Sequence, residues 1–292
     1  MESTDVITTL GERDIAGALA LSASAHWNQN ENDWREMLRL GQGFGICMPD
    51  AAGQEVLAAS LIVLPYSPKH GHAFSWVSMV LVLPAFQRLG FASMLLRHAV
   101  KLLSAQGITP ILDATPAGHA VYLQEGFADT WGFARYRREA VEPSASIPST
   151  RVLRDDDWVA IQAIDEPAFG ASRMALLHSL AKRLPHAARV AEQQGSLCGY
   201  CFARDGREAT QIGPLVATEV AVATRLLQDA LATQPGTLYL DLLDHQKALL
   251  PWLQQRGFVF QRPFTRMVHG MQNPAAPGDP QNIVLAAGPE LG

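Results

Sequence analysis

Residues 80–92 read VLVLPAFQRLGFA, the end of a strand followed directly by the start of a helix. The strand is the apolar run over 75–83, which is typical of a buried central strand, and Pro84 ends it. A helix follows over 87–103, where apolar residues recur at helical spacing, and a second strand follows over 108–114. A strand, a helix and a second strand in this order imply a right-handed crossover between parallel neighbours. The sequence therefore predicts an α/β fold.

The turn into this helix has the chemistry of a phosphate site. A helix N-terminus carries unpaired backbone N–H groups and a partial positive charge, which suit a phosphate or a pyrophosphate. Gly90 and Ala92 keep side chains out of the way, and Arg88 adds a positive charge. The alternative is a plain strand-to-helix connection that needs a glycine.

The amino-acid composition excludes several classes of protein. The 292 residues are 48% apolar and 17% charged, with a formal net charge of −5, so we expect two domains of ordinary size and no dedicated nucleic-acid binder. No apolar run reaches the ~18 residues of a membrane span, and residues 1–14 do not resemble a signal peptide. Cys47, Cys198 and Cys201 form no disulfide framework and are too few for a zinc site. We therefore expect a cytoplasmic protein without a metal, acting on small molecules.

A weak internal repeat has an offset of 131 residues. The recurring residues are Leu95, Leu96, Ala99, Gly126, Phe127, Phe133 and Arg135, which return as Leu226, Leu227, Ala230, Gly257, Phe258, Phe264 and Arg266. The expected elements follow the same order in both halves. A unit this long indicates a duplicated domain, because the units of a solenoid are only ~20–50 residues.

The boundary between the two copies is predicted from composition. The stretch EPSASIPS over 142–149 is rich in Pro and Ser and indicates a linker. The predicted domains are therefore 1–141 and 150–292. Within the second, we expect a loop over 271–282 and a terminal strand over 283–286.

Two motifs in the first half lie at the spacing seen in one enzyme family. The first is Q-x-x-G-x-A at 87–92, after a strand that ends V-x-P at 82–84. The second is the helix end YLQEGF at 122–127. They resemble the pyrophosphate loop and the Tyr-x-x-x-Gly-Phe helix end of the GNAT acetyltransferase superfamily.

The resemblance extends to a bacterial subgroup of tandem GNAT proteins and covers nearly the whole chain. In the first half it rests on residues 27–29, 33–34 and 112–118. In the second half the residues that carry it are Asp165, Phe169-Gly170-Ala171-Ser172-Arg173, Ile212-Gly213-Pro214-Leu215, Gly257-Phe258, Arg262 and Arg266-Met267. It implies two tandem GNAT-like acyl-CoA N-acyltransferase domains, α+β units with a mixed sheet.

The resemblance implies acetyl-CoA as co-substrate, lying in a gap between two parallel strands. Backbone groups around Val80 and Val82 would bond its pantetheine arm, and one N–H would polarise the thioester carbonyl. The implied pyrophosphate loop is Gln87, Arg88, Leu89, Gly90, Phe91, Ala92 and Ser93. The acceptor amine would attack directly, and Tyr122 would protonate the leaving thiolate. The alternative for Tyr122 is a core position on an apolar helix face.

The general base is left open. The strand over 75–83 contains no acid, and Asp113 ends the neighbouring strand, so Asp113 is a candidate to accept the proton or to hold the ammonium of the acceptor. A structural acid that caps the helix near Ala117 is the equal alternative, and a water chain is another candidate base. The candidates for the acceptor pocket are Trp27, Asn28 and Asp33.

The second half lacks the residues of this site. At the repeat offset the loop arginine becomes Glu219, the loop glycine becomes Ala221 and the tyrosine becomes Leu253. We therefore predict one active site per chain, and a degenerate second domain that closes the acceptor site. Its candidate lining residues are Asp165, Arg173, Asp241, His245 and Arg262. The first two of these could instead form an internal ion pair.

The expected function is transfer of an acetyl group from acetyl-CoA to the primary amine of a small molecule, with no nucleic-acid, membrane or metal partner. One alternative is an acyl-CoA-binding sensor without catalysis, favoured by the missing strand carboxylate. Another is a protein or peptide N-acetyltransferase, which would need an open acceptor groove. The acceptor, the length of the acyl chain and the oligomeric state are left open by the sequence.

Overall fold

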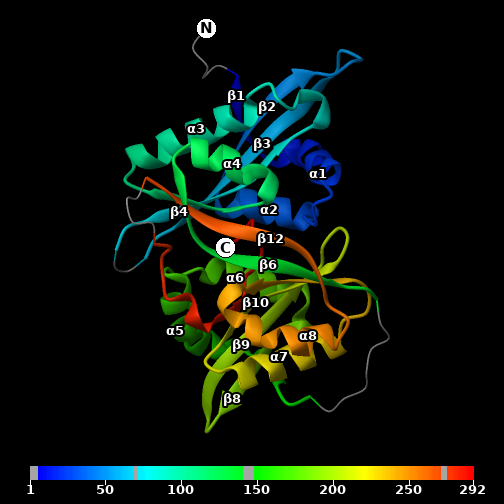
Figure 1. Ribbon diagram of the computed structural model, residues 1–292, viewed down its shortest axis with the longest axis vertical. Helices are drawn as coiled ribbons and strands as arrows, with labels where there is room; N and C mark the ends of the chain where they lie inside the picture. Colours follow the sequence, from blue (N-terminus) through cyan, green and yellow to red (C-terminus); the bar gives the residue numbers. More distant parts are fainter. Residues whose placement is uncertain (1–5, 69–70, 141–147, 271–274) are drawn as a thin grey trace.

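The structure is a computed structural model, and it describes residues 6–68, 71–140, 148–270 and 275–292. Its two halves stack along the long axis of the molecule and share one mixed sheet (Figure 1). Within the described residues this sheet has 13 strands, in the order β1-β2-β3-β4-β5-β12-β6-β11-β13-β10-β9-β8-β7. None of the helices in these ranges is long and apolar enough to span a bilayer.

Both halves contain strands and helices in nearly the same order. Those of the first half are β1 (Ile7–Leu10), α1 (Ile15–Ser24), α2 (Glu31–Leu40), β2 (Gln42–Pro49), β3 (Glu55–Tyr66), β4 (Phe74–Val82), α3 (Phe91–Ala105), β5 (Thr109–Ala114), α4 (Pro116–Gln124) and β6 (Phe127–Arg138). Those of the second half are β7 (Arg151–Val152), α5 (Trp158–Phe169), α6 (Met174–Arg183), β8 (Arg189–Gln193), β9 (Ser196–Arg204), β10 (Thr210–Ala217), α7 (Val220–Ala232), β11 (Leu238–Leu243), α8 (Leu250–Gln254), β12 (Val259–His269) and β13 (Ile283–Leu285). The α/β fold class is confirmed.

The stretch from β4 to α3 forms as predicted except at the start of the helix. The strand predicted over 75–83 is β4, but the helix predicted from residue 87 begins only at Phe91. Residues Pro84–Phe86 form a 3-10 turn, and Arg88 and Gly90 have φ angles of 65° and 84°. Left-handed residues cannot belong to an α-helix, so the turn extends to Gly90, which is the N-cap of α3.

A gap opens between β4 and β5. The two strands pair in parallel only from Phe74 to Trp76, opposite Thr109 to Ile111, and then separate. On the other side, β4 carries a bulge against β3, where Met79 has a φ of 51°. The backbone of β4 after Trp76 is thus free of β5, as the predicted strand gap requires.

The equivalent gap in the second half is filled. Strands β10 and β11 pair in parallel over Thr210–Ile212 and Leu238–Leu240, and beyond that point β13 lies between them. Leu285 of β13 is opposite Leu215 on one side and Leu242 on the other. The terminal strand predicted over 283–286 is therefore present, and it occupies the space that the first half leaves open.

The two halves exchange their last long strands. β6 of the first half pairs with β11 of the second, and β12 of the second half pairs with β5 of the first. β6 and β12 lie side by side across the middle of the molecule (Figure 1). The sequence did not predict this exchange. Most of the linker predicted over 142–149 lies outside the described residues, so the domain boundary stays a prediction.

Candidate active site

The N-terminus of α3 faces a cleft with its backbone N–H groups available. The first intrahelical bond runs from Met94 N to Gly90 O, at 2.9 Å, so the N–H groups of Phe91, Ala92 and Ser93 have no acceptor within the helix. A Cβ at Gly90 would meet no atom within 4 Å, so the need for glycine there comes from its φ of 84°. Unpaired N–H groups at a helix N-terminus fit the pyrophosphate of CoA.

The cleft has a volume of about 640 Å³ and runs from this turn to Tyr122. Of the predicted CoA-binding residues, those that line it are Val80, Val82, Gln87, Arg88, Gly90, Phe91, Ala92 and Ser93. Leu89 is not among its lining residues, and its side chain is 58% exposed to solvent. A single cleft therefore connects the splayed strand β4 with the N-terminus of α3.

Tyr122 lies on α4 at the inner end of the cleft. Gly118, one turn earlier, gives it room: a Cβ there would be 2.8 Å from Cε2 of the ring and 3.2 Å from its hydroxyl oxygen. Burial raises the pKa of Tyr122 to about 12. The hydroxyl therefore stays protonated over the physiological range and remains able to donate a proton.

A second cavity, of about 30 Å³, adjoins the cleft, and we call it the acceptor cavity. Its lining residues are Trp27, Gln29, Val77, Ser78, Met79, Val80, Leu112, Asp113, Thr115, Tyr122, Arg135, Arg262, Phe264, Pro289 and Glu290. It shares Trp27, Val80, Asp113, Thr115 and Tyr122 with the cleft. The two cavities therefore adjoin at these residues, Tyr122 among them, where a donor and an acceptor would meet.

Asp113 is bound by the second half of the chain. Its two carboxylate oxygens accept hydrogen bonds from Nε and Nη2 of Arg266, at 2.9 and 3.0 Å. Burial raises the pKa of Asp113, and Arg266 offsets part of this. The predicted helix-capping role is wrong, because Thr115 is the N-cap of α4 and its Oγ1 accepts from Gly118 N. Both oxygens of Asp113 are thus already engaged.

The three residues predicted for the acceptor pocket do not lie together in the structure. Trp27 lines both cavities, whereas Asn28 and Asp33 are not lining residues of either. The Asn28 side chain bonds the backbone of the second half at Glu208 and Ala209. Asp33 accepts from Asn30 N and forms ion pairs with Arg183, at 2.9 Å, and with Arg204, at 3.2 Å. These two residues therefore join the halves instead of facing an acceptor.

Only some of the second-half residues predicted to line the acceptor site are found there. Arg262 lines the acceptor cavity, and Asp241 holds Arg135, another lining residue. Asp165 and Arg173 form the alternative internal ion pair, at 2.9 Å, and His245 is exposed.

Several residues that line the acceptor cavity were missed by the sequence reasoning. Gln29 neighbours a predicted residue, and Ser78 lies in the predicted central strand, so position gave a signal for these two. Phe264 lies between the two arginines of the second-half motif. Pro289 and Glu290 carried no signal, because their place depends on how residues 286–292 fold back toward the first half.

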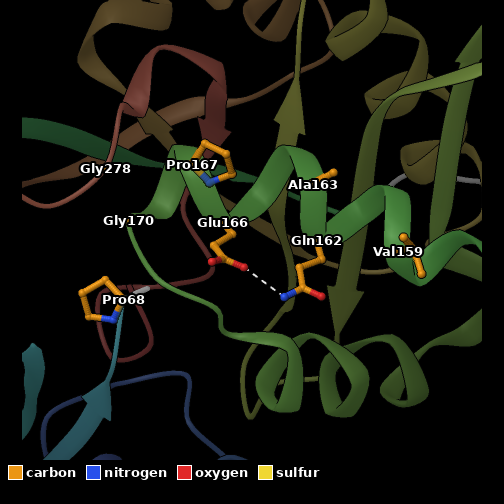
Figure 2. Close-up of a pocket in the computed structure, with 8 residues that line it drawn as sticks. All are labelled: Pro68, Val159, Gln162, Ala163, Glu166, Pro167, Gly170 and Gly278. Atoms are coloured by element: carbon orange, nitrogen blue, oxygen red, sulfur yellow. Dashed lines mark hydrogen bonds between the residues drawn. The ribbon is translucent and has the colours of Figure 1, made fainter. Parts of the chain in front are cut away.

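Another hollow, of about 610 Å³, lies along α5 (Figure 2). Its lining is Pro68, Val159, Gln162, Ala163, Glu166, Pro167, Gly170 and Gly278, and Gln162 donates to Glu166 at 2.9 Å. It shares no residue with the two cavities described above. Nowhere in the described ranges does a group of His, Cys, Asp and Glu side chains form a site that could hold a metal ion. Cys198 and Cys201 are free thiols.

Comparison with known proteins gives matches to both halves. Residues 19–127 match the model of the acetyltransferase (GNAT) family, and residues 161–281 match that of an acetyltransferase (GNAT) domain. The uncharacterized N-acetyltransferase YitH of Bacillus subtilis (strain 168) is 23% identical over 261 residues, which are 88% of this chain and 89% of that protein.

Solved structures share the whole fold. A candidate acetyltransferase from Pyrococcus horikoshii superposes with a TM-score of 0.77 at 18% identity, covering 98% of this chain and 95% of that one. A tandem GNAT protein from the clavulanic acid biosynthesis pathway superposes with a TM-score of 0.61 at 15% identity, covering 92% and 99%. At these identities the likeness is one of fold.

Proposed function

The chain belongs to the GNAT acetyltransferase family and carries two domains of that family in tandem, and from this premise we propose that its first half transfers the acetyl group of acetyl-CoA to the primary amine of a small molecule. The observation that carries the proposal is the continuous path from the N-terminus of α3, past the free backbone of β4, to Tyr122 and the acceptor cavity. Such a path holds the three parts that the reaction needs: a phosphate site, a thioester site and an amine site.

The residues of the path have separate tasks in this proposal. The N–H groups of Phe91, Ala92 and Ser93, together with Arg88, bind the pyrophosphate of CoA. The backbone at Val80 and Val82 holds the pantetheine arm and polarises the thioester carbonyl, which is the oxyanion-type stabilisation that often dominates catalysis.

The acceptor attacks directly in this scheme. Neither cavity has a cysteine or a histidine among its described lining residues, so no thiol nucleophile or histidine base is at hand for a covalent intermediate. Tyr122 donates its proton to the leaving thiolate. Asp113 acts as a charged anchor for Arg266, because both of its oxygens are occupied.

Two observations favour one active site per chain. The gap between β10 and β11 contains β13, and the N-cap of α7 is Glu219, whose carboxylate would repel a pyrophosphate. The second half instead covers the acceptor cavity through β12 and residues 289–290. A covered cavity favours a small acceptor over a polypeptide. Free thiols and an acyl-CoA substrate are in keeping with a reducing cytoplasm.

The test is calorimetric binding of acetyl-CoA followed by an assay of thiol release with a panel of small primary amines and a panel of peptides. Binding with thiol release for small amines alone supports the proposal. Binding without release for any acceptor would favour an acyl-CoA sensor, and release with peptides would favour a peptide N-acetyltransferase. Propionyl-CoA and longer thioesters in the same assay define the acyl group.

A further inference from the structure

We propose that the acceptor is an amine that also carries a carboxylate, with amino acids as the class to test first. Arg262 binds the carboxylate of this acceptor and Glu290 binds its ammonium. The inference rests on the proposed function, because it names the chemistry of the acceptor at the same site. It is carried by buried polar atoms that have no hydrogen-bond partner within the described chain and belong to residues that line the acceptor cavity.

Arg262 is a cation without a counter-charge. Two other charged side chains that line the cavity already have ion-pair partners: Arg135 pairs with Asp241, and Asp113 pairs with Arg266. Among the described residues Arg262 has no ion pair, and its buried Nε has no hydrogen-bond acceptor. The pKa of Arg262 is lowered by burial and by the neighbouring Arg135, which the surrounding acids do not fully offset. A cation in this setting binds a ligand anion, and a guanidinium matches a carboxylate in shape.

Glu290 forms a buried ion pair with Arg204, and one of its carboxylate oxygens remains without a donor in the described chain. Its side chain is almost fully buried, Oε1 accepts from Arg204 Nη2, and the buried Oε2 has no donor in the described chain. Its position is fixed by the bonds of the residues beside it: Trp76 Nε1 donates to Pro289 O, at 3.0 Å, and Tyr66 donates to Leu291 O, at 2.9 Å. A buried carboxylate oxygen without a donor is costly, and the ammonium of a ligand supplies one.

Neutral groups of the cavity suit the same ligand. Gln29 Oε1 is buried without a donor and can accept a second N–H of the amine, and Ser78 Oγ is also buried without a partner. The remaining walls include Trp27 and Phe264, which are apolar. Because the cavity holds only about 30 Å³, these walls must move apart when an amino acid binds, and small amino acids should bind best. Tyr122 and Glu290 line the same cavity, so an amine held at Glu290 would share this cavity with the proposed general acid.

The reaction balances with these groups. The amine nitrogen forms a bond to the acetyl carbonyl carbon, the carbon–sulfur bond breaks, and the thiolate takes the proton of Tyr122. The ammonium loses two protons in becoming an amide: one restores Tyr122, and the other passes to solvent by way of the free oxygen of Glu290. No oxidant, reductant or further reactant is needed.

The first experiment compares acceptors in matched pairs. Each of the twenty standard amino acids, with β-alanine and 4-aminobutyrate, is assayed for thiol release beside the amine that lacks its carboxylate. We expect kcat/KM to be at least about tenfold higher for the carboxylated member of the preferred pair. Equal or faster release with the decarboxylated amines would overturn the inference and leave the proposed function standing.

The second experiment changes the two binding residues. Arg262→Gln should raise KM for the preferred amino acid by about 10- to 100-fold and should affect its decarboxylated amine less, so that the preference between the two falls. Glu290→Gln should weaken both members of the pair. Arg256→Gln is the matched control, because Arg256 lies six residues earlier, stacks on Trp252 and lines neither cavity. An unchanged amino-acid preference in Arg262→Gln would contradict the assignment.

A binding measurement separates failure of the inference from failure of the proposed function. If no amine releases thiol, the same pairs are titrated into the protein saturated with CoA. Amino-acid binding that Arg262→Gln abolishes keeps the acceptor class and rejects the transfer reaction. Absence of amino-acid binding rejects the acceptor class. The melting temperature of Arg262→Gln should not fall, because the change removes a partly buried charge that forms no ion pair with the described residues.

Discussion

Arg266 on β12 donates from Nε and Nη2 to the two carboxylate oxygens of Asp113 on β5, at 2.9 and 3.0 Å. The repeat-related Arg135 on β6 does the same to Asp241 on β11, at 2.8 and 2.7 Å. In both pairs the two residues lie directly opposite each other on antiparallel strands. Each half therefore forms an ion pair with the other through its exchanged strand.

Asp113→Asn should lower the free energy of unfolding by about 3–5 kcal/mol, because it leaves the buried Arg266 guanidinium without a counter-charge. Urea denaturation followed by circular dichroism measures the change. The control is Glu125→Gln, which breaks an exposed pair with Arg97 and should cost less than about 1 kcal/mol. A similar small loss in both variants would show that the pair is not a strong contact between the halves.

A double variant of the same ion pair tests whether Asp113 has a catalytic role. The double variant Asp113→Leu, Arg266→Met removes both charges, so it should be more stable than Asp113→Asn alone. If Asp113 is an anchor, this folded variant keeps thiol release within about tenfold of the wild type. A loss of about a hundredfold or more in kcat, with the fold intact, would instead support Asp113 as the general base.

The site could be predicted where its chemistry is local in sequence. The turn at Gly90, the central strand and Tyr122 all follow from motifs within a few residues, and all of them lie on the path that carries the proposed function. Asn28 and Asp33 were assigned by resemblance alone, and the structure shows them in contact with the second half. A polar residue near a site can bind a ligand or another part of the protein, and sequence does not separate the two.

The strand exchange could not be predicted, because the repeat itself makes it ambiguous. β6 and β12 are copies, so each has the alternation that either position in the sheet requires. Phe133 and Phe264, repeat equivalents, lie opposite each other with ring centroids 4.9 Å apart and planes at 12°. Local pattern fixes which face of a strand is buried. It does not fix which copy of a neighbour the strand pairs with.

Gly118→Ala should lower kcat by about tenfold or more while the protein stays folded. The added Cβ would lie 2.8 Å from the Tyr122 ring, so the ring must move and its hydroxyl leaves the thiolate position. Helix stability should be unchanged or raised by up to about 1 kcal/mol, because alanine is the better helix former. Steady-state thiol release and thermal melting measure the two effects.

A double-mutant cycle is the control for Gly118. In the Tyr122→Phe background the alanine should have little further effect on kcat, because the hydroxyl it displaces is already absent. Independent, multiplying losses would mean that Gly118 acts on something other than Tyr122.

Ionisation of the Tyr122 hydroxyl should not lower kcat at any pH below 10. Its pKa is raised to about 12 by burial, and a general acid is active in its protonated form, which prevails below the pKa. We expect kcat, measured at saturating substrates from pH 7 to 10, to show no loss that depends on this residue. Tyr122→Phe should lower kcat by about a hundredfold with the same profile. A loss near pH 8–9 in the wild type that vanishes in Tyr122→Phe would contradict this.

Acetyl-CoA should bind at one site per chain, because β13 already fills the gap in the second half. Leu285 is opposite both Leu215 and Leu242, so no free strand edge remains there for a pantetheine arm. In calorimetric titrations Arg88→Glu should weaken binding by about tenfold or more. The reciprocal change Glu219→Arg restores the missing charge at α7, yet the number of sites should stay at one. Two sites in the wild type would mean that the second half also binds acetyl-CoA. A second site that appears only in Glu219→Arg would mean that the charge of Glu219, and not β13, prevents binding to the second half.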